Sequence, residues 1–312
     1  MLPILESGEE TLVGGQAVME GVMMRAPHSY CVAVRKPSGE IVTEQAPLAR
    51  MSEMYRIFKL PVFRGVGTLY QALKLGGRAL RFSAAAALDD PAKQAEPAKE
   101  IPGWAMAGPI VFSLAFFIFA YKFVPLFVVT RLAKIYPALE GRLAFNSVDG
   151  LVRLAILLTL LFVIARFKDI KRVFEYHGGE HRVVFNFESG QAVTVKAAQQ
   201  FTTYHPRCGT SFLFVVFLLA IPAYAMLPFT GFAAKLAARV VLMPVIAGVA
   251  YELIRFAAKR RGSILATLTA PGLWMQRITT KPPADDQTAV AIHALEGAMA
   301  LEKSQGGELV IA

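Results

Sequence analysis

Residues 211–234 read SFLFVVFLLAIPAYAMLPFTGFAA, a run without a charged side chain. A transmembrane helix needs about 20 mostly apolar residues to cross roughly 30 Å of hydrocarbon. Residues 104–130 meet the same requirement, with Lys122 as their single charge. These two runs therefore predict helices that cross a membrane, and they decide the class of fold.

The composition of the whole chain agrees with a membrane protein. The 312 residues are 55% hydrophobic and have a mean hydropathy of +0.46, which is too apolar for an ordinary soluble domain. Of two weaker apolar runs, 151–165 is interrupted by Arg153 and 240–251 is preceded by Arg239. We expect these arginines and Lys122 to lie near span ends and reach the membrane surface. The predicted spans lie near 104–130, 148–166, 211–230 and 238–257, within a membrane domain of residues 103–260. The predicted fold class is a mostly α polytopic membrane protein with about four transmembrane helices and small α+β cytoplasmic parts.

Basic residues flank the apolar runs and predict the topology. Cytoplasmic loops of membrane proteins carry an excess of Lys and Arg, and these residues are concentrated in 166–210 and in 255–261. We therefore expect both termini and the 166–210 loop to face the cytoplasm. The net charge of +10 forms no continuous basic tract, so nucleic acid is not an expected partner. The lipid bilayer is the expected partner, and a homo-oligomer is left open.

The other segments predict smaller units around the membrane domain. Residues 12–50 alternate between apolar and polar side chains and are interrupted by glycines. This pattern predicts an extended unit with a hairpin near 30–45 and Cys31 in its core. Residues 51–83 form a basic amphipathic segment that lies on the membrane or packs on a neighbouring domain. Residues 84–102 have the composition of a linker, and 261–312 form a C-terminal cytoplasmic segment with an amphipathic helix capped by Asp285 and Asp286.

Chemistry is concentrated in Glu175-Tyr176-His177-Gly178-Gly179-Glu180-His181. In a helix, His177 and His181 would lie one turn apart on one face and could share a zinc ion, with Glu180 beside them as a general base. The two glycines weaken a helix by about 1 kcal/mol each relative to alanine. Residues 182–187 moreover have the pattern of a strand, so the helical form of this motif is one of two alternatives.

A second motif, His205-Pro206-Arg207-Cys208-Gly209, lies in the same predicted loop. Thr194 can cap a short helix before it, and Pro206 favours an extended His205. The His-x-x-Cys spacing suits chelation of a divalent metal ion, and zinc matches nitrogen and sulfur ligands. The predicted metal ligands are His177, His181, His205 and Cys208.

Three more side chains are candidates for an auxiliary role. Glu175 is a reserve ligand. Glu20, flanked by glycine, could approach the metal as ligand or base, and Arg25 could bind an anionic group. A structural turn with a solvated salt bridge explains Glu20 and Arg25 equally well.

The number of metal ligands separates two functions. Four protein ligands leave no open position on a tetrahedral zinc ion. The site is then structural and holds the loop in place, as in a non-catalytic scaffold or assembly protein. Three ligands leave a position for water, and Glu180 can then act as base in a metal-dependent hydrolase at the membrane surface. A transporter would need polar groups that face one another near the membrane midplane, and we expect residues 211–230 to offer none.

Four ordered motifs together resemble one family. They are Gly14 to Met23, Glu175 to His181, His205 to Phe212, and Pro271 to Gln287. They are similar to the bacterial YqhQ-like membrane family, a domain of unknown function, and the resemblance extends from about residue 13 to 300. It implies a protein of the bacterial cytoplasmic (inner) membrane and a metal-dependent enzyme that uses the same histidines. The sequence departs from the family at Gly179, where alanine is usual.

Overall fold

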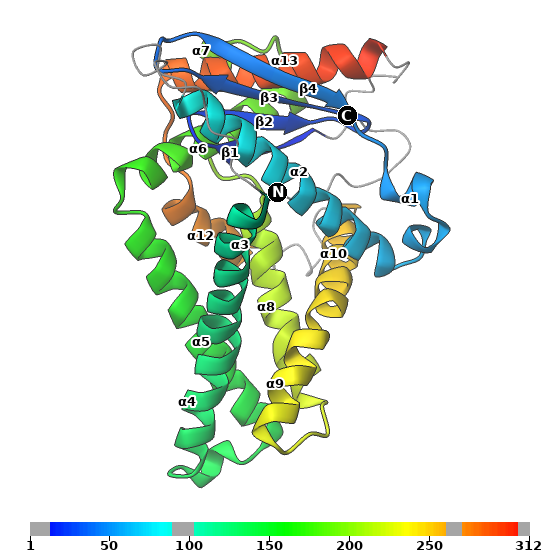
Figure 1. Ribbon diagram of the computed structural model, residues 1–312, viewed down its shortest axis with the longest axis vertical. Helices are drawn as coiled ribbons and strands as arrows, with labels where there is room; N and C mark the ends of the chain where they lie inside the picture. The colour runs from blue at the N-terminus through cyan, green and yellow to red at the C-terminus, as the bar shows by residue number, and fades with distance from the viewer. Residues whose placement is uncertain (1–12, 89–102, 260–269, 305–312) are drawn as a thin grey trace.

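The chain forms two stacked parts, a layer that contains a β-sheet and a bundle of helices below it (Figure 1). The computed structural model describes residues 13–88, 103–259 and 270–304. Most of the predicted linker at 84–102 and parts of the C-terminal segment at 261–312 lie outside these ranges. Within them, the protein is mostly helical and has one four-stranded antiparallel sheet.

The sheet is a simple meander in the order β1-β2-β3-β4. Its strands are β1 (Gly14–Val18), β2 (Gly21–Arg25), β3 (Ser29–Arg35) and β4 (Ile41–Pro47). The pair β3 and β4 is a hairpin, as the alternation near 30–45 predicts. Gly21 is required where β2 meets β3, because a Cβ there would meet the Ala33 carbonyl oxygen at 2.3 Å. The sheet is therefore closely paired at its centre.

Helices cover both faces of the sheet, which explains why its strands are apolar on both sides. Met23 and Val32 pack against α2 (Phe63–Leu88), while Met24 and Cys31 pack against the opposite layer. That layer consists of α6 (Lys168–Glu188) and α13 (Asp285–Ser304). The predicted core position of Cys31 and the predicted C-terminal helix are both found.

Helix α2 shows one of the two arrangements expected for the basic amphipathic segment. It follows the short elements α1 (Met51–Met54) and η1 (Arg56–Lys59), and Leu75 and Ala79 pack on the sheet. Tyr70 and Leu73 on its other side are 58% and 69% exposed. Packing on a neighbouring domain therefore accounts for one face, and contact of the other face with lipid stays a prediction.

The bundle supplies the candidate membrane spans. Among the described residues, Val111–Ala133 and Arg142–Ile164 are long and apolar enough to cross a membrane, and Phe232–Val241 with Met243–Ala257 would make a third if their 44° bend lies within one span. Gly209–Ala225 is a shorter apolar helix. The bundle elements are α3 (Gly103–Ile118), the π-helical η3 (Phe119–Phe123), α4 (Val124–Ala133), α5 (Arg142–Ile164), α8 (Gly209–Ala225), α9 (Phe232–Val241) and α10 (Met243–Lys259). Two or three candidate spans thus indicate a membrane location.

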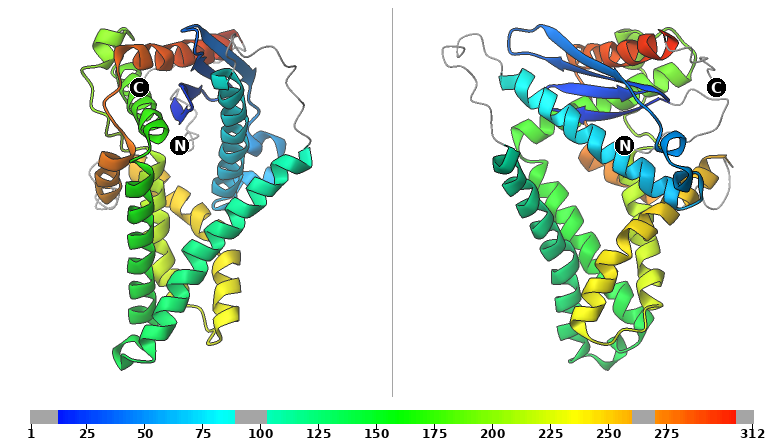
Figure 2. Two further views of the ribbon diagram at one scale, coloured as in Figure 1. Left: turned by 60° about the vertical axis from the view of Figure 1, so that its left-hand side comes forward. Right: turned by 45° about the vertical axis from the view of Figure 1, so that its right-hand side comes forward.

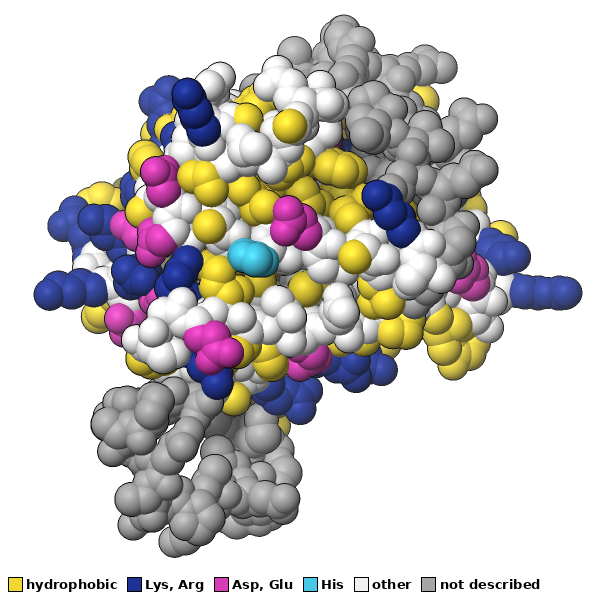
Figure 3. Space-filling view, turned by 90° about the horizontal axis from the view of Figure 1, so that it is seen from above, with side chains coloured by type: hydrophobic (Ala, Val, Ile, Leu, Met, Phe, Trp, Pro, Cys, Tyr) yellow, Lys and Arg dark blue, Asp and Glu magenta, His cyan; other side chains and the backbone are white. Residues whose placement is uncertain are grey.

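The connections of the bundle lie at opposite ends of the molecule (Figures 1 and 2). The α4–α5 connection, which contains η4 (Pro137–Leu139), and the α8–α9 connection lie far from the sheet. The segment from α6 through α7 (Val195–Ala198), and also α12 (Ala270–Thr279), lies near it. The outer face of the sheet layer bears side chains of both charges among apolar ones (Figure 3). One end of the bundle therefore lies against the sheet layer, and the other end holds the α4–α5 and α8–α9 connections (Figure 1).

The expectation that the charged residues of the spans reach the membrane surface is wrong. Lys122, Arg153 and Arg239 are only 4%, 3% and 2% exposed. Instead of pointing outward, they turn toward one another inside the bundle, where Arg153 and Arg239 share the carboxylate of Asp149. Helix packing provides partners within the bundle, so extension to the surface is unnecessary.

Candidate metal site

The first histidine motif lies in the middle of a continuous helix. Helix α6 extends from Lys168 to Glu188, so the strand expected at 182–187 is wrong. Gly178 has a packing function, because a Cβ there would meet the Lys281 carbonyl oxygen at 1.9 Å. The Lys281 N–H also donates to the Phe174 carbonyl of α6 at 2.9 Å. The glycine therefore lets the backbone after α12 lie directly on the helix, and this packing offsets its low helix propensity.

This helix brings two histidines and a cysteine together. His177 and His181 lie one turn apart, with ring centroids 4.4 Å from each other. Cys208, the N-cap residue of α8, places its Sγ 3.4 Å from His177 Nε2. One ligand atom from each of the three residues lies within 4.8 Å of the other two. The group could therefore hold a metal ion.

Backbone carbonyls orient both imidazoles. His177 Nδ1 lies 2.9 Å from the Thr279 carbonyl oxygen, and His181 Nδ1 lies 2.5 Å from that of Thr203. A carbonyl oxygen can only accept, so each Nδ1 is the protonated nitrogen and Nε2 is left for other partners. Metal-binding histidines commonly have this arrangement, in which the second ring nitrogen donates to a carbonyl or carboxylate and fixes the ring.

The three residues fit a zinc ion by geometry and by chemistry. Bonds of about 2.0–2.3 Å in a tetrahedral site place ligand atoms roughly 3.5 Å apart. The observed 3.4 Å from Cys208 Sγ to His177 Nε2 matches this spacing. Small side-chain movements would bring the third ligand atom into the same range.

The charges around His181 favour a proton on this ring, and a metal ion bound here would take the place of that proton. Burial raises the pKa of Cys208, but His177 and His181 outweigh burial and hold this pKa well below its usual value. Burial lowers the pKa of His181, but the Glu180 carboxylate and Cys208 outweigh it and raise the pKa to about 9. The lowered pKa favours the thiolate of Cys208, the form of cysteine that binds metals.

His205, the fourth predicted ligand, lies beside this group and not in it. Its ring centroid is 5.6 Å from that of His181, and it packs at 4.4 Å against Phe185. Its Nδ1 accepts the N–H of Arg207 at 3.2 Å. Burial and the neighbouring His181 lower the pKa of His205 to about 4, so the ring is neutral. The geometry thus converges on three ligands where the sequence predicts four.

Glu180 lies next to the group, on the side of the sheet. It is 6% exposed, and its Oε2 is 3.5 Å from His181 Nε2. The side chain fits against β1 only because Gly15 has no side chain, since a Cβ at Gly15 would lie 2.4 Å from Glu180 Cγ. The glycine motif at the start of the chain therefore makes room for the carboxylate.

The auxiliary candidates lie elsewhere. Glu20 has a φ of 50° in the β1–β2 turn and accepts two hydrogen bonds of 2.5 Å from the guanidinium of Arg172, which is the structural salt bridge. Glu175 Oε2 accepts a hydrogen bond from Gln287 of α13 at 3.0 Å. Both carboxylates therefore hold α6 to its neighbours and do not reach the metal group.

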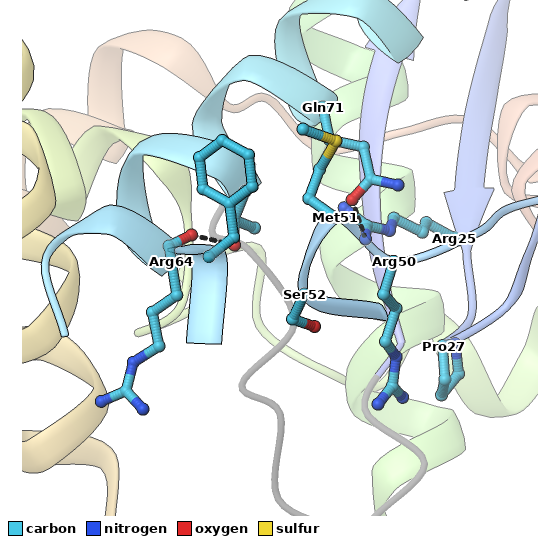
Figure 4. A pocket seen from close by; sticks show the side chains of 9 residues that line it. Arg25, Pro27, Arg50, Met51, Ser52, Arg64 and Gln71 are labelled. Carbon is cyan, nitrogen blue, oxygen red and sulfur yellow. Dashed lines mark hydrogen bonds between the residues drawn. The ribbon is translucent and has the colours of Figure 1, made fainter. Parts of the chain in front are cut away.

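Arg25 lies in a separate pocket between the sheet, α1 and α2 (Figure 4). Its Nη2 donates to Gln71 Oε1 at 3.2 Å. Arg50 and Arg64 line the same pocket, and Arg64 pairs with Glu252 of α10. The arginine therefore has no part in the metal group.

Sequence reasoning missed the residues that position the histidines. The carbonyls of Thr203 and Thr279 are backbone groups that every residue has, so the sequence does not indicate their contacts with the histidines. Gln276, which is fully buried, accepts the N–H of His205 and donates to its carbonyl, both at 2.8 Å. A glutamine within the apolar stretch around Trp274 is the one sequence signal that could have indicated this contact.

The fold and the site define a class: a mostly helical protein with candidate membrane spans and a His/His/Cys group that could hold a metal ion. The chain belongs to the family described as Protein of unknown function (DUF1385), whose model matches residues 60–301. It is 32% identical over 297 residues to the uncharacterized protein YqhQ of Bacillus subtilis (strain 168), which covers 93% of this chain and 92% of the relative. No solved structure matches it significantly.

The two adjacent glycines of the motif give a matched test. We expect Gly178→Ala to displace the 279–283 backbone, to lower stability by about 1–3 kcal/mol and to weaken zinc binding. Gly179→Ala should leave both intact or raise stability, because its Cβ would find its nearest atom at 3.5 Å. Melting temperature and zinc content of the purified variants measure this. Equal behaviour of the two variants would contradict the close contact at Gly178.

Proposed function

We propose that this protein is a membrane-bound metalloprotein that binds zinc through His177, His181 and Cys208 and acts as a hydrolase-like enzyme at the membrane surface. The convergence of these three ligand atoms within 4.8 Å supports the proposal most directly. Zinc sites with three protein ligands and one open position are typical of catalysis, whereas sites with four are typical of structural roles.

The residues around the ligands provide the other parts of such a site. A bound zinc ion would supply a Lewis acid that polarises a carbonyl or phosphoryl oxygen. Glu180 is placed to accept and return a proton, because its carboxylate is buried and borders His181. The Thr203 and Thr279 carbonyls keep both imidazoles directed at the open centre.

The proposed architecture has four spans: the helix at 111–133, α5, α8 and the bent pair α9–α10. The positions of the connections at the far end of the bundle support it (Figure 1). At about 1.5 Å per residue, the 17 residues of α8 reach about 26 Å, close to the thickness of the hydrocarbon. The basic residues between α5 and α8 support a cytoplasmic position for the sheet layer and the metal group.

A specific observation also favours the competing function, a closed structural site in a scaffold or assembly protein. His205 is 5% exposed, and in the described parts of the chain its Nε2 makes no hydrogen bond, with Glu188 Oε2 3.6 Å away. A change in the 203–208 turn that released Nδ1 from the Arg207 N–H, moved the ring proton to Nδ1 and brought Nε2 inward would supply a fourth ligand. The choice between the two functions therefore depends on whether His205 binds the metal.

Cysteines introduced at exposed positions test on which side of the membrane each connection lies. Ala138 in η4 and Ser38 in the β3–β4 turn are exposed, whereas the native Cys31 and Cys208 are buried. We expect Ala138→Cys to react with a membrane-impermeant thiol reagent in intact bacteria and Ser38→Cys to react only after lysis, with the unsubstituted protein as control. The reverse pattern would overturn the proposed orientation.

Metal content distinguishes the two kinds of site. We expect the purified protein to hold stoichiometric zinc, and His177→Ala and Cys208→Ser to lose it, because each removes one of three ligands. His205→Ala should retain zinc if the site is open and lose it if the site is closed. Elemental analysis measures this, and a purified protein without any transition metal would refute the site.

Glu180→Gln tests the role of the carboxylate. We expect zinc content and melting temperature to be unchanged, because the amide has almost the same shape. In the cobalt-substituted protein, the visible spectrum should change with pH, and Glu180→Gln should shift its midpoint, since the neighbouring charge is lost. A spectrum that does not depend on pH in either protein would favour the closed site.

A further inference from the structure

The bundle contains a second polar centre, unrelated to the metal group. Lys122 of η3, Asp149 and Arg153 of α5, and Arg239 of α9 are each at most 4% exposed. Lys122 Nζ donates to the Tyr224 hydroxyl of α8 at 3.1 Å. Within residues 211–230, Tyr224 therefore contacts this centre, close to the end of α8 at Ala225.

Two of the cations lie at the middle of the two longest candidate spans, measured along each helix. Lys122 is the central residue of the 23-residue helix Val111–Ala133, and Arg153 is the central residue of Arg142–Ile164. At about 1.5 Å per residue, each is about 17 Å from either end of its helix. Ionisable residues at this depth are costly, and they commonly mark ion or substrate sites.

The positive charges outnumber the negative ones. Asp149 is the carboxylate that contacts the centre, and it is shared: its Oδ1 accepts from Arg239 Nη1 at 2.7 Å and its Oδ2 faces Arg153. Arg239 Nη2 donates to Asn146 Oδ1 at 2.6 Å. Over the ranges that the structure describes, this one carboxylate pairs with both arginines, and Lys122 contacts the Tyr224 hydroxyl instead of a carboxylate. Among the residues that the structure describes, Arg153 Nε makes no hydrogen bond although it is buried.

A purely structural role explains part of this arrangement. The ring of Tyr224 lies 4.9 Å from the Arg153 guanidinium, 5.1 Å from that of Arg239 and 5.5 Å from Lys122 Nζ. Cation–π contacts of this kind disperse positive charge. They do not neutralise it, and they provide no acceptor for Arg153 Nε.

The helix backbones are irregular around the same centre. Lys122 lies in the π-helical segment Phe119–Phe123, and Pro222 interrupts α8 two residues before Tyr224. Arg239 lies close to the 44° bend between α9 and α10. π-Helical segments and broken membrane helices are frequent at ligand sites. The excess of positive charge and the irregular helix backbones therefore occur at the same place in the bundle.

We infer that Lys122, Arg153 and Arg239 form an oxyanion site inside the membrane bundle, which accepts a phosphate or sulfate type of group. Arginine and lysine are the groups that bind such oxyanions. The Tyr224 hydroxyl donates to the Arg239 carbonyl at 3.3 Å and accepts from Lys122 Nζ, so it positions the site and is not a donor to the ligand. Asp149 holds the two arginines in place and leaves the excess positive charge to the ligand. The oxyanion belongs either to a free inorganic ion or to the headgroup of an anionic lipid.

The site is tested on the full chain, purified in neutral detergent, by its melting temperature against sodium phosphate and sulfate, with chloride at equal ionic strength as reference. We expect a saturable rise with the oxyanions that chloride does not produce. Lys122→Met leaves the Asp149 ion pairs intact and should raise the half-saturating concentration about tenfold or more. Arg131→Gln, at the exposed end of the same helix, should behave as the unsubstituted protein.

A parallel series in lipid nanodiscs identifies the source of the oxyanion. If phosphatidylglycerol discs stabilise the protein over phosphatidylcholine discs, and Lys122→Met abolishes the difference while Arg131→Gln does not, the ligand is a lipid phosphate. If neither inorganic oxyanions nor anionic lipid stabilise the protein, or if Lys122→Met responds as the unsubstituted protein does, the centre is structural and the inference is overturned.

Discussion

The contact between the backbone after α12 and the surface of α6 at Gly178 is the constraint on which the rest of the sheet layer depends. Lys281 donates to a carbonyl of α6, and its own carbonyl lies where a side chain of residue 178 would be. This contact places Thr279 beside His177 and leads the chain into α13, which covers the sheet. Because Gly178 has no side chain, one backbone contact connects the metal group with the core of the sheet layer.

The two polar centres of the protein solve the same physical problem in different ways. Buried polar groups are costly unless they find partners. At the metal group, carbonyls satisfy both Nδ1–H groups, and a thiolate and a carboxylate face the remaining nitrogens. In the described part of the bundle, the Asp149 carboxylate pairs with two arginines, and the Tyr224 ring lies near both of them and Lys122. We propose a cation as the ligand of the first centre and an anion as the ligand of the second.

The metal group and the polar centre of the bundle lie at the two ends of one helix, α8. Cys208 caps α8, and Tyr224 lies near the other end of that helix, so one helix borders both centres. The metal group lies at the junction of the bundle and the sheet layer, between α6 and the start of α8. The proposed oxyanion site lies inside the bundle.

The sequence by itself determined the membrane character of the chain and the identity of the residues in the metal group. Long apolar runs can only be buried in lipid or protein, and His, Cys and Glu at chelating spacing are rare enough to stand out. It could not determine that residues 182–187 are helical, that His205 lies outside the group, or that Lys122, Arg153 and Arg239 meet. Those outcomes depend on contacts between segments far apart in the chain, such as Gly178 with Lys281 and Asp149 with Arg239. Tertiary packing decided them, because it outweighs the low helix propensity of glycine and supplies a buried charge with partners that local sequence does not reveal.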